Sequence, residues 1–200
     1  MVPAFNEAKT IKAQIEKLSK IGDVIIINDG STDGTRAICE SSECKLVNLG
    51  TNCGYDYALE IGIKACLHYD FIITTDADGE IPVEFVSQVK DKLISGFDCV
   101  VGVRDKYPRI AEIFVNYIVY KKFRLKDIFC GLKGYRVDEI KADFSLAGSV
   151  GTLLAITFLK NRKSFATIPI EVKTRDGESR FGRNDLKTNH RLLKVLKHVW

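Results

Sequence analysis

The sequence has few of the residues on which several classes of protein depend. Its 200 residues include one Met, one Trp, four Pro and three His. It has no run of about 18 apolar residues, which argues against a membrane-spanning helix. The first residues do not form the basic and then apolar pattern of a signal peptide. Composition therefore predicts one globular domain over residues 1–200, with 46% hydrophobic residues available for its core.

Cysteine is present but is not arranged for metal binding. The six cysteines stand at positions 39, 44, 53, 66, 99 and 130, and no pair forms a CxxC motif. With only three His to complete a zinc site, we expect reduced, mostly buried thiols in a cytosolic protein.

Several nucleotide-binding motifs are also missing. No GxxxxGK[ST] segment is present, so the chain has no P-loop. The glycines of LGTNCGYDYAL precede a predicted helix but do not match GxGxxG, which argues against a dinucleotide site. The basic half contains no recognisable nucleic-acid-reading module.

Charge is divided unevenly along the chain. The net charge is +4, but residues 1–103 carry 9 Lys and Arg against 16 Asp and Glu, and residues 104–200 carry 21 against 10. Either this is ordinary solvated surface, or acids in the first half hold a cation and bases in the second half face phosphates or an anionic membrane.

Apolar periodicity alternates between strand and helix. Short apolar runs predict strands in DVIIIND, SSECKLVNLG, FIITTD, DCVVGVR and ATIPIEVKT. Helices are predicted over 8–20, in GYDYALEIGIKACLHYD, in PVEFVSQVKDKLISG, over 108–125, around 148–160, and in a closing basic segment. This alternation predicts an α/β fold with a mostly parallel sheet flanked by helices.

Acidic residues follow two of the predicted strands. Asn28 and Asp29 end one strand, and Asp76, Asp78 and Glu80 follow another. Ligands of parallel sheets bind at the carboxyl ends of strands, and clustered carboxylates repel unless a cation lies among them. Mg²⁺ or Mn²⁺ with a bound phosphate would explain the cluster. Alternatively, Asp76 caps the next turn and the other acids are solvated.

Seven segments in order carry a resemblance to a known family. They are VPAFNE, VIIINDGSTDGT, LGTNCGYDYAL, FIITTDADGE, VVGVRD, DIFCGLKGYR and RDGESRFG. Together they resemble family-2 glycosyltransferases of the GT-A (Rossmann-like) fold, over nearly the whole chain. The nearest branch is the polyprenyl-phosphate sugar synthases, which includes dolichyl-phosphate mannose synthases.

The resemblance implies a nucleotide-sugar donor (a GDP- or UDP-sugar), a divalent cation and inversion at the sugar's anomeric carbon. It implies a nucleotide-sugar-binding half over 1–103 and an acceptor-binding half over 104–200. It assigns the nucleotide to Pro3, Phe5, Glu7, Asp29 and Asp76. The resemblance further implies metal contacts from Asp76, with Asp78 and Glu80 as ligands.

The resemblance also assigns groups to the chemistry and the acceptor. Arg104 would stabilise charge on the leaving diphosphate, or pair with Asp105 at the surface. Asp127 would act as a base for a sugar hydroxyl, or orient the sugar or the phosphate-binding loop if the acceptor is a lipid phosphate. The acceptor phosphate would be bound by Arg109, Arg175, Ser179 and Arg180.

This sequence departs from the family at several positions. Only Met1 and Val2 precede the proline of the first motif, so either the chain is trimmed, or its start is misassigned, or the first strand is very short. Asn28 replaces an acid, and Glu80 replaces a common Gln. Tyr55 and Asp56 stand where relatives have small residues.

Two basic amphipathic segments, 108–126 and 186–200, suit the cytoplasmic face of an anionic membrane or a membrane partner, or are ordinary core helices. Two other readings of function stay open: transfer to a saccharide hydroxyl in surface-glycan synthesis, and a non-catalytic nucleotide-sugar-binding subunit. A nucleotidyltransferase would require a Gly-rich basic loop near the N-terminus, which VPAFNEAKT does not provide.

Overall fold

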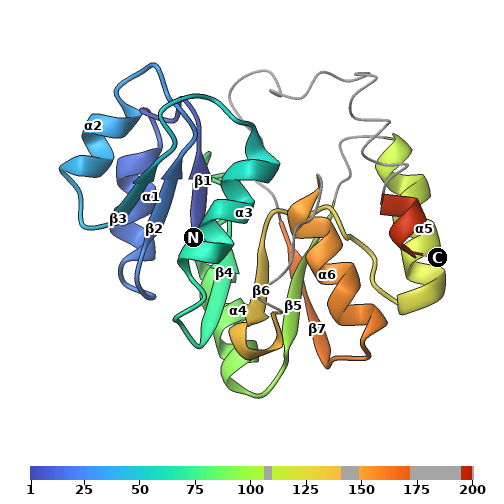
Figure 1. Cartoon of the computed structure of the whole chain (residues 1–200). Coiled ribbons are helices and arrows are strands. Elements are labelled where there is room, and N and C mark those ends of the chain that lie inside the picture. The colour runs from blue at the N-terminus through green and yellow to red at the C-terminus, as the bar shows by residue number, and fades with distance from the viewer. Residues whose placement is uncertain (106–109, 141–148, 172–194, 200) are drawn as a thin grey trace.

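The structure, a computed structural model, describes residues 1–105, 110–140, 149–171 and 195–199 (Figure 1). The strands are β1 (Val2–Ala4), β2 (Ile25–Asn28), β3 (Lys45–Asn48), β4 (Phe71–Thr74), β5 (Cys99–Arg104), β6 (Lys133–Arg136) and β7 (Phe165–Ile170). The helices are α1 (Ile11–Leu18), α2 (Thr35–Glu40), α3 (Tyr55–Ala65), α4 (Val83–Ile94), α5 (Ile110–Phe123), α6 (Val150–Lys160) and the 3₁₀ turn η1 (Val137–Glu139). The expected α/β class is confirmed.

The first sheet is parallel and has the order β1-β2-β3. Val2 lies opposite Ile26, and Ile25 lies opposite Lys45. All four residues of β2 are buried, as its continuous apolar run predicts for a strand covered on both faces. The carboxyl ends of the three strands therefore meet at one edge of the sheet.

The second sheet is mixed and has the order β4-β6-β5-β7. β6 runs antiparallel to both β4 and β5, whereas β5 and β7 are parallel. The sequence pattern predicts no element in the DIFCGLKGYR segment, whereas in the structure β6 forms its last part. The antiparallel strand brings this segment beside the end of β4.

The two sheets meet at β1 and β4. The Met1 amino group donates to the Ile73 carbonyl at 2.8 Å, and the Thr75 N–H donates to the Met1 carbonyl at 3.4 Å. These two bonds follow the pattern of a parallel ladder. β1 has three residues.

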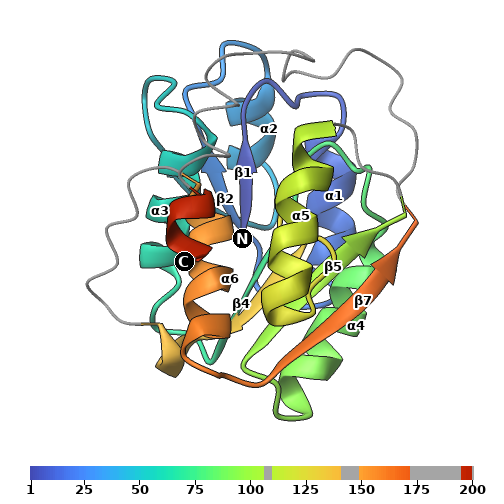
Figure 2. The same ribbon diagram turned by 90° about the vertical axis from the view of Figure 1, so that its right-hand side faces the viewer.

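Helices cover both faces of the sheets (Figures 1 and 2). α3, α5 and α6 pack against one face, where Met1, Ile25 and Ile27 contribute to the core. α1, α2 and α4 cover the other face, where Val2 and Ile26 are buried. Neighbouring residues of β1 and β2 thus face opposite layers, as strand geometry requires.

The helices begin and end where the sequence favours it. α4 begins directly after Pro82, which lacks the N–H that a first turn leaves without a helical partner. α6 is apolar on nearly all sides and lies in the core. The closing basic segment lies outside the described residues except for 195–199, which are helical.

All six cysteines are described, and all are free thiols, four of them buried. This agrees with the absence of paired spacing in the sequence. Within the described residues, no helix is long and apolar enough to cross a membrane.

Candidate functional site

The loops that follow β1 and β2 are joined by side-chain hydrogen bonds. The Asn6 N–H donates to the Ser31 hydroxyl at 2.9 Å, and the Thr32 N–H donates to the Asn6 side chain at 2.8 Å. The Glu7 N–H donates to the Thr35 hydroxyl at 2.8 Å. Asn6 has a φ of 55°, a left-handed conformation that Asn tolerates better than most residues. The two loops thus form one wall at the carboxyl edge of the sheet.

Glu7, which the resemblance assigns to the nucleotide, is buried in this wall. Its carboxylate accepts from the Thr10 hydroxyl at 3.2 Å. Of the other residues assigned with it, Pro3 is buried within β1 and Phe5 is half-buried just after it. The structure therefore places all three along one short segment, although no described contact tests their role.

Asp29 holds the loop that leads into α3. One carboxylate oxygen accepts from the Cys53 N–H at 2.7 Å, and the other accepts from the Gly54 N–H at 2.9 Å. Gly30 follows with a φ of 67°, and a Cβ there would collide with the backbone of Thr51 and Asn52. Asp29 is thus bound to main chain on both oxygens, and its predicted contact with a nucleoside stays a prediction.

The replacement of an acid by Asn28 has a local explanation. The Asn28 side chain donates to the Asn48 side-chain oxygen at 2.6 Å and accepts from the Ser31 N–H at 3.3 Å. An amide can donate and accept at once, which a carboxylate cannot do. Asn28 therefore ties the ends of β2 and β3 together.

Tyr55 accounts for a second departure from the family pattern. Its hydroxyl donates to the Asp76 carboxylate at 3.2 Å, which links the first turn of α3 to the end of β4. A Cβ at Gly131 would collide with the same carboxylate, so the loop before β6 approaches it closely. Asp76 is therefore fixed between two elements that are distant in sequence.

Asp56, the neighbouring departure, holds a different element. Its carboxylate accepts from the Val150 N–H at 3.2 Å, at the start of α6. Helix N-termini present N–H groups without helical partners, and an acidic side chain stabilises them. The segment 53–56 thus contacts β2 through Asp29, β4 through Tyr55, and α6 through Asp56.

The predicted metal ligands fit a cation only in part. Burial raises the pKa of the Asp76 carboxyl group, and the nearby Asp78 charge raises it further. The Asp78 carboxylate also accepts from the Glu80 N–H at 3.1 Å, which forms a tight turn. In the described residues, no three acidic, His or Cys side chains gather into a metal-binding group.

Two close carboxylates remain a suitable arrangement for Mg²⁺ or Mn²⁺, because Mg²⁺ commonly takes one or two carboxylates and completes its shell with phosphate oxygens and water. Asp76 and Asp78 meet that description, since the Asp78 charge acts on the Asp76 carboxyl group at the same strand end. The role of Glu80 as a third ligand stays a prediction.

Arg104 and Asp127 form a paired-charge centre at the end of β5. The guanidinium donates to both Asp127 oxygens, at 2.7 and 3.0 Å, and to Glu112 at 3.1 Å. Asp127 is fully buried. Burial alone would lower the pKa of Arg104, but the hydrogen bonds and charge of Asp127, together with Glu112, raise it overall. The alternative of a surface pair with Asp105 is not what the structure shows.

Asp127 makes further contacts that restrict it. One oxygen also accepts from the Phe129 N–H at 3.2 Å and from the Asn116 side chain at 3.5 Å. Both Asp127 oxygens thus already accept hydrogen bonds from groups of the protein. This geometry favours a positioning role for Asp127 over that of a base.

Lys133, the first residue of β6, places a buried amine near both Asp76 and Asp127. Its amine donates to the Cys130 carbonyl and is buried. Burial lowers the pKa of this amine, while the charges of Asp127 and Asp76 oppose that change. Lys133 thus offsets part of the negative charge of both acids.

Several residues at these strand ends are not marked as functional by the sequence pattern, namely Asn6, Thr35, Glu112, Asn116, Gly131 and Lys133. The turn composition of STDGT gives a signal for Thr35, and Asn6 lies in the VPAFNE segment. The others come from elements joined only by the fold. Arg109, Arg175, Ser179 and Arg180, predicted to bind the acceptor phosphate, lie outside the described residues.

Comparison with known proteins identifies the family. The model of glycosyl transferase family 2 matches residues 1–148. The chain belongs to this family. A Methanocaldococcus jannaschii protein designated MJ1222 is 33% identical over 158 residues, which cover 70% of this chain and 65% of that protein.

A second relative of this family-2 chain is the undecaprenyl-phosphate 4-deoxy-4-formamido-L-arabinose transferase of Aeromonas hydrophila. It is 28% identical over 205 residues, covering 91% of this chain and 62% of that one. The chain therefore spans just under two thirds of the length of both relatives.

Solved structures establish the fold of the family-2 domain. Glucosyl-3-phosphoglycerate synthase from Mycobacterium tuberculosis, in complex with UDP, matches with a TM-score of 0.76 at 17% identity. The match covers 99% of this chain and 76% of that one. The same enzyme with Mn²⁺, UDP and glucosyl-3-phosphoglycerate gives a TM-score of 0.75 at 18% identity. The expected GT-A fold is confirmed.

Proposed function

We propose that this chain transfers a sugar, with inversion, from a GDP- or UDP-sugar to a polyprenyl phosphate, and that Mg²⁺ or Mn²⁺ assists the reaction. Family membership supports glycosyl transfer. The polyprenyl-phosphate acceptor is supported by the relative from Aeromonas hydrophila, whose name gives undecaprenyl phosphate.

The donor would bind at the carboxyl edge of the first sheet. The joined loops after β1 and β2 supply Phe5, Glu7 and Asp29 along one wall, and Asp76 and Asp78 follow at the end of β4. The solved neighbour of the same fold binds UDP with Mn²⁺, which supports a donor of this class. The base and the sugar stay undetermined.

Asp76 and Asp78 would hold the cation together with the donor diphosphate. When bound there, a divalent cation stabilises the negative charge that develops on the departing diphosphate. The chain's own contribution is to fix Asp76 through the Tyr55 hydroxyl and the close backbone of Gly131. A preorganised carboxylate loses less entropy when the donor complex forms.

The engagement of Asp127 is the observation that favours a phosphate acceptor. A sugar hydroxyl needs a base to remove its proton, whereas a phosphate monoester is already ionised near pH 7. The Asp127 carboxylate accepts from Arg104 on both oxygens and is fully buried. A site whose candidate base already accepts from Arg104 on both oxygens is suited to an acceptor that needs no deprotonation.

Transfer of radiolabelled sugar tests the proposal. GDP- and UDP-sugars are offered with a short polyprenyl phosphate or with a saccharide acceptor, in Mn²⁺, in Mg²⁺ and in EDTA. Label that enters the lipid phase with metal, and disappears with EDTA, is the expected result. Label in the saccharide would reject the acceptor assignment. Donor binding with no transfer would favour a non-catalytic binding subunit.

A further inference from the structure

The buried face of α1 carries one polar side chain. Four residues of this helix are buried, and three of them are apolar, namely Ile11, Ile15 and Leu18. The fourth is Gln14, which is 8% exposed. No described residue hydrogen-bonds to its side-chain amide. Because amides that are largely withdrawn from water are usually paired, packing alone does not explain a glutamine at this position.

The amide of Gln14 packs against the turn that carries the predicted metal ligands. A Cβ at Gly79 would lie 2.5 Å from the Gln14 Nε2 atom, so the amide occupies the space that a side chain there would fill. Gly79 has a φ of 77°, in the left-handed region that glycine favours. It separates Asp78 from Glu80, and the Asp78 carboxylate accepts from the Glu80 N–H at 3.1 Å. The amide therefore lies directly against the turn that orients Asp78.

The residues on both sides of this turn are anchored in the same layer as α1. Ala77 and Ile81 are buried and belong to the core cluster that includes the apolar residues of α1. The three residues between them, 78–80, are half-buried. The turn is thus fixed to apolar groups at its two ends, whereas its middle packs against an amide.

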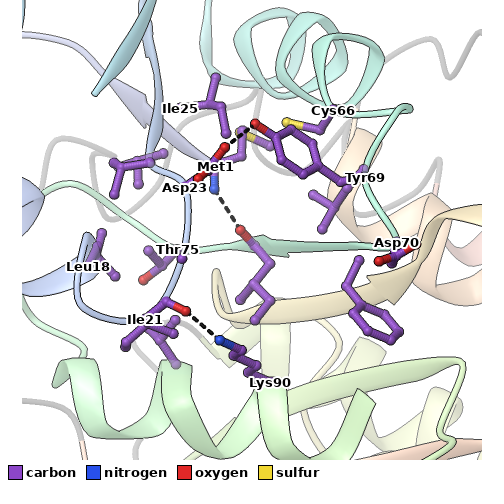
Figure 3. Close-up of a pocket in the computed structure, with 17 residues that line it drawn as sticks. Met1, Leu18, Ile21, Asp23, Ile25, Cys66, Tyr69, Asp70, Thr75 and Lys90 are labelled. Atoms are coloured by element: carbon purple, nitrogen blue, oxygen red, sulfur yellow. Dashed lines mark hydrogen bonds between the residues drawn. The ribbon is translucent and has the colours of Figure 1, made fainter. Parts of the chain in front are cut away.

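α1 is itself held against the helix that follows the turn. The Lys90 amine of α4 donates to the Ile21 carbonyl, just after the end of α1, at 2.5 Å (Figure 3). Leu18 of α1 and Val86 of α4 belong to the same core cluster. The turn leads into α4, and α4 is bonded to the end of α1, so the support for the turn is fixed. A change of one side chain on α1 can therefore alter the orientation of Asp78 without moving the helix.

We propose that Gln14 is a positioning residue for the divalent cation of the proposed function, on which this inference rests. When the cation is bound, the Gln14 amide donates to a backbone carbonyl of the turn 78–80 and holds the Asp78 carboxylate toward the cation. Glycine at position 79 allows the small peptide rotation that presents such a carbonyl. The amide thereby gains a hydrogen-bond partner, and it donates without adding a charge beside Asp76 and Asp78.

A variant of similar shape tests the role of the amide. Gln14→Met keeps the length of the side chain and removes its hydrogen-bonding groups. Mn²⁺ binding, titrated in saturating UDP and followed by electron paramagnetic resonance, should weaken about fivefold or more, as for the loss of one hydrogen bond. Tm should stay the same or rise, because an apolar group replaces a largely buried amide. Gln88→Met, at an exposed position of α4, is the control and should change neither quantity.

A pair of substitutions tests the contact between Gln14 and Gly79. In the parent chain, Gly79→Ala should weaken Mn²⁺ binding at least about tenfold, because the new Cβ displaces the amide and the φ of 77° strains an alanine. In a Gln14→Ala background, the same change should weaken binding only about threefold, since the space is then free and the strain alone remains. Equal losses in the two backgrounds would contradict the contact.

The outcomes separate the role of Gln14 from the proposed function. If the parent chain binds Mn²⁺ and Gln14→Met binds it equally tightly, the role of Gln14 is overturned and the metal site stands. A loss of affinity together with a fall in Tm of more than about 5 °C would also overturn that role, because the amide would then serve packing. Absence of Mn²⁺ binding by the parent chain in UDP would reject the metal site of the proposed function, and the role of Gln14 with it.

Discussion

Groups from three separate parts of the chain surround the Asp76 carboxylate. Tyr55 donates to it from α3, Gly131 packs against it from the loop before β6, and the Asp78 charge acts on it from the same strand end. Its raised pKa, caused first by burial, means that its charged form needs a nearby positive partner. A bound cation would supply that partner.

Replacing Tyr55 by Phe tests this arrangement at a single atom. Tyr55→Phe removes the hydroxyl donor and keeps the ring, so the fold should persist while Asp76 loses its fixed position. We expect Mn²⁺-dependent UDP binding to weaken about fivefold, as for the loss of one hydrogen bond. Isothermal titration measures it. Tyr57→Phe, on the exposed side of the same helix, is the control; identical affinities in the two variants would contradict the role of Tyr55.

Asp78 is the carboxylate whose loss should affect turnover most directly. Asp78→Ala should lower kcat by at least about 100-fold, because the cation would lose a ligand beside the departing diphosphate. Its Tm should change by no more than about 2 °C. Asp91→Ala, on the exposed surface of α4, is the control. Activity near that of the parent chain would remove Asp78 from the metal site.

At the scale of elements, the first turn of α3 connects helices and strands that the sequence pattern predicts only one by one. Gly54 and Cys53 bind Asp29, and Asp56 binds the start of α6. Loss of the Asp29 contacts should release the loop before α3, and loss of the Asp56 contact should release the start of α6. This turn thus connects the loop after β2, through Asp29, with the end of β4, through the Tyr55 contact to Asp76.

Asp56→Ala should destabilise α6 and leave α3 intact. Loss of a carboxylate that accepts from a helix N-terminus costs about 1 kcal/mol, which lowers Tm by about 2–4 °C in a chain of this size. Thermal unfolding followed by circular dichroism measures the change. Glu60→Ala, which removes only an exposed pair with Lys64 on α3, should lower Tm by less. An equal loss in both variants would argue against the contact with Val150.

Helices and strands could be predicted from the sequence where the apolar residues follow a single helical or strand pattern. Ile11, Ile15 and Leu18 mark α1, and the apolar run before Asn28 marks β2. β6 was not predicted, because a four-residue strand within KGYR has neither alternation nor an apolar run. The family resemblance pointed to Asp76 and Asp127, but pairing Asp127 with Arg104 needs β5 and a loop 23 residues away. No local pattern encodes such a contact.

At the scale of the whole molecule, α5 carries exposed apolar side chains next to basic ones. Ile113, Phe114 and Tyr117 are 49%, 62% and 58% exposed, and the Lys121 amine lies over the Tyr117 ring. The second half of the chain carries the excess of basic residues. An apolar face beside cations is the composition that binds the interface of an anionic bilayer.

Vesicle binding tests this surface independently of sugar transfer. Phe114→Ser combined with Tyr117→Ser should reduce co-sedimentation with phosphatidylglycerol vesicles by at least about tenfold, because two side chains would no longer enter the interface. High salt should weaken binding of the parent chain through screening. Ile94→Ser, a comparably exposed residue on α4, is the control. Unchanged binding in the double variant would exclude α5 as the contact.

The join between the sheets at Met1 also affects how the chain assembles. Met1 and Ile73 are 72 residues apart, so closing that contact carries the entropy cost of a long loop before any ladder energy is gained. At synthesis rates of about 5–20 residues per second, Ile73 is made roughly 4–14 s after Met1. During that interval β1 can pair with β2 but has no β4 beside it. The contact between β1 and β4 therefore forms late. Until β4 has been synthesised, the unpaired edge of β1 must be protected from pairing with other chains.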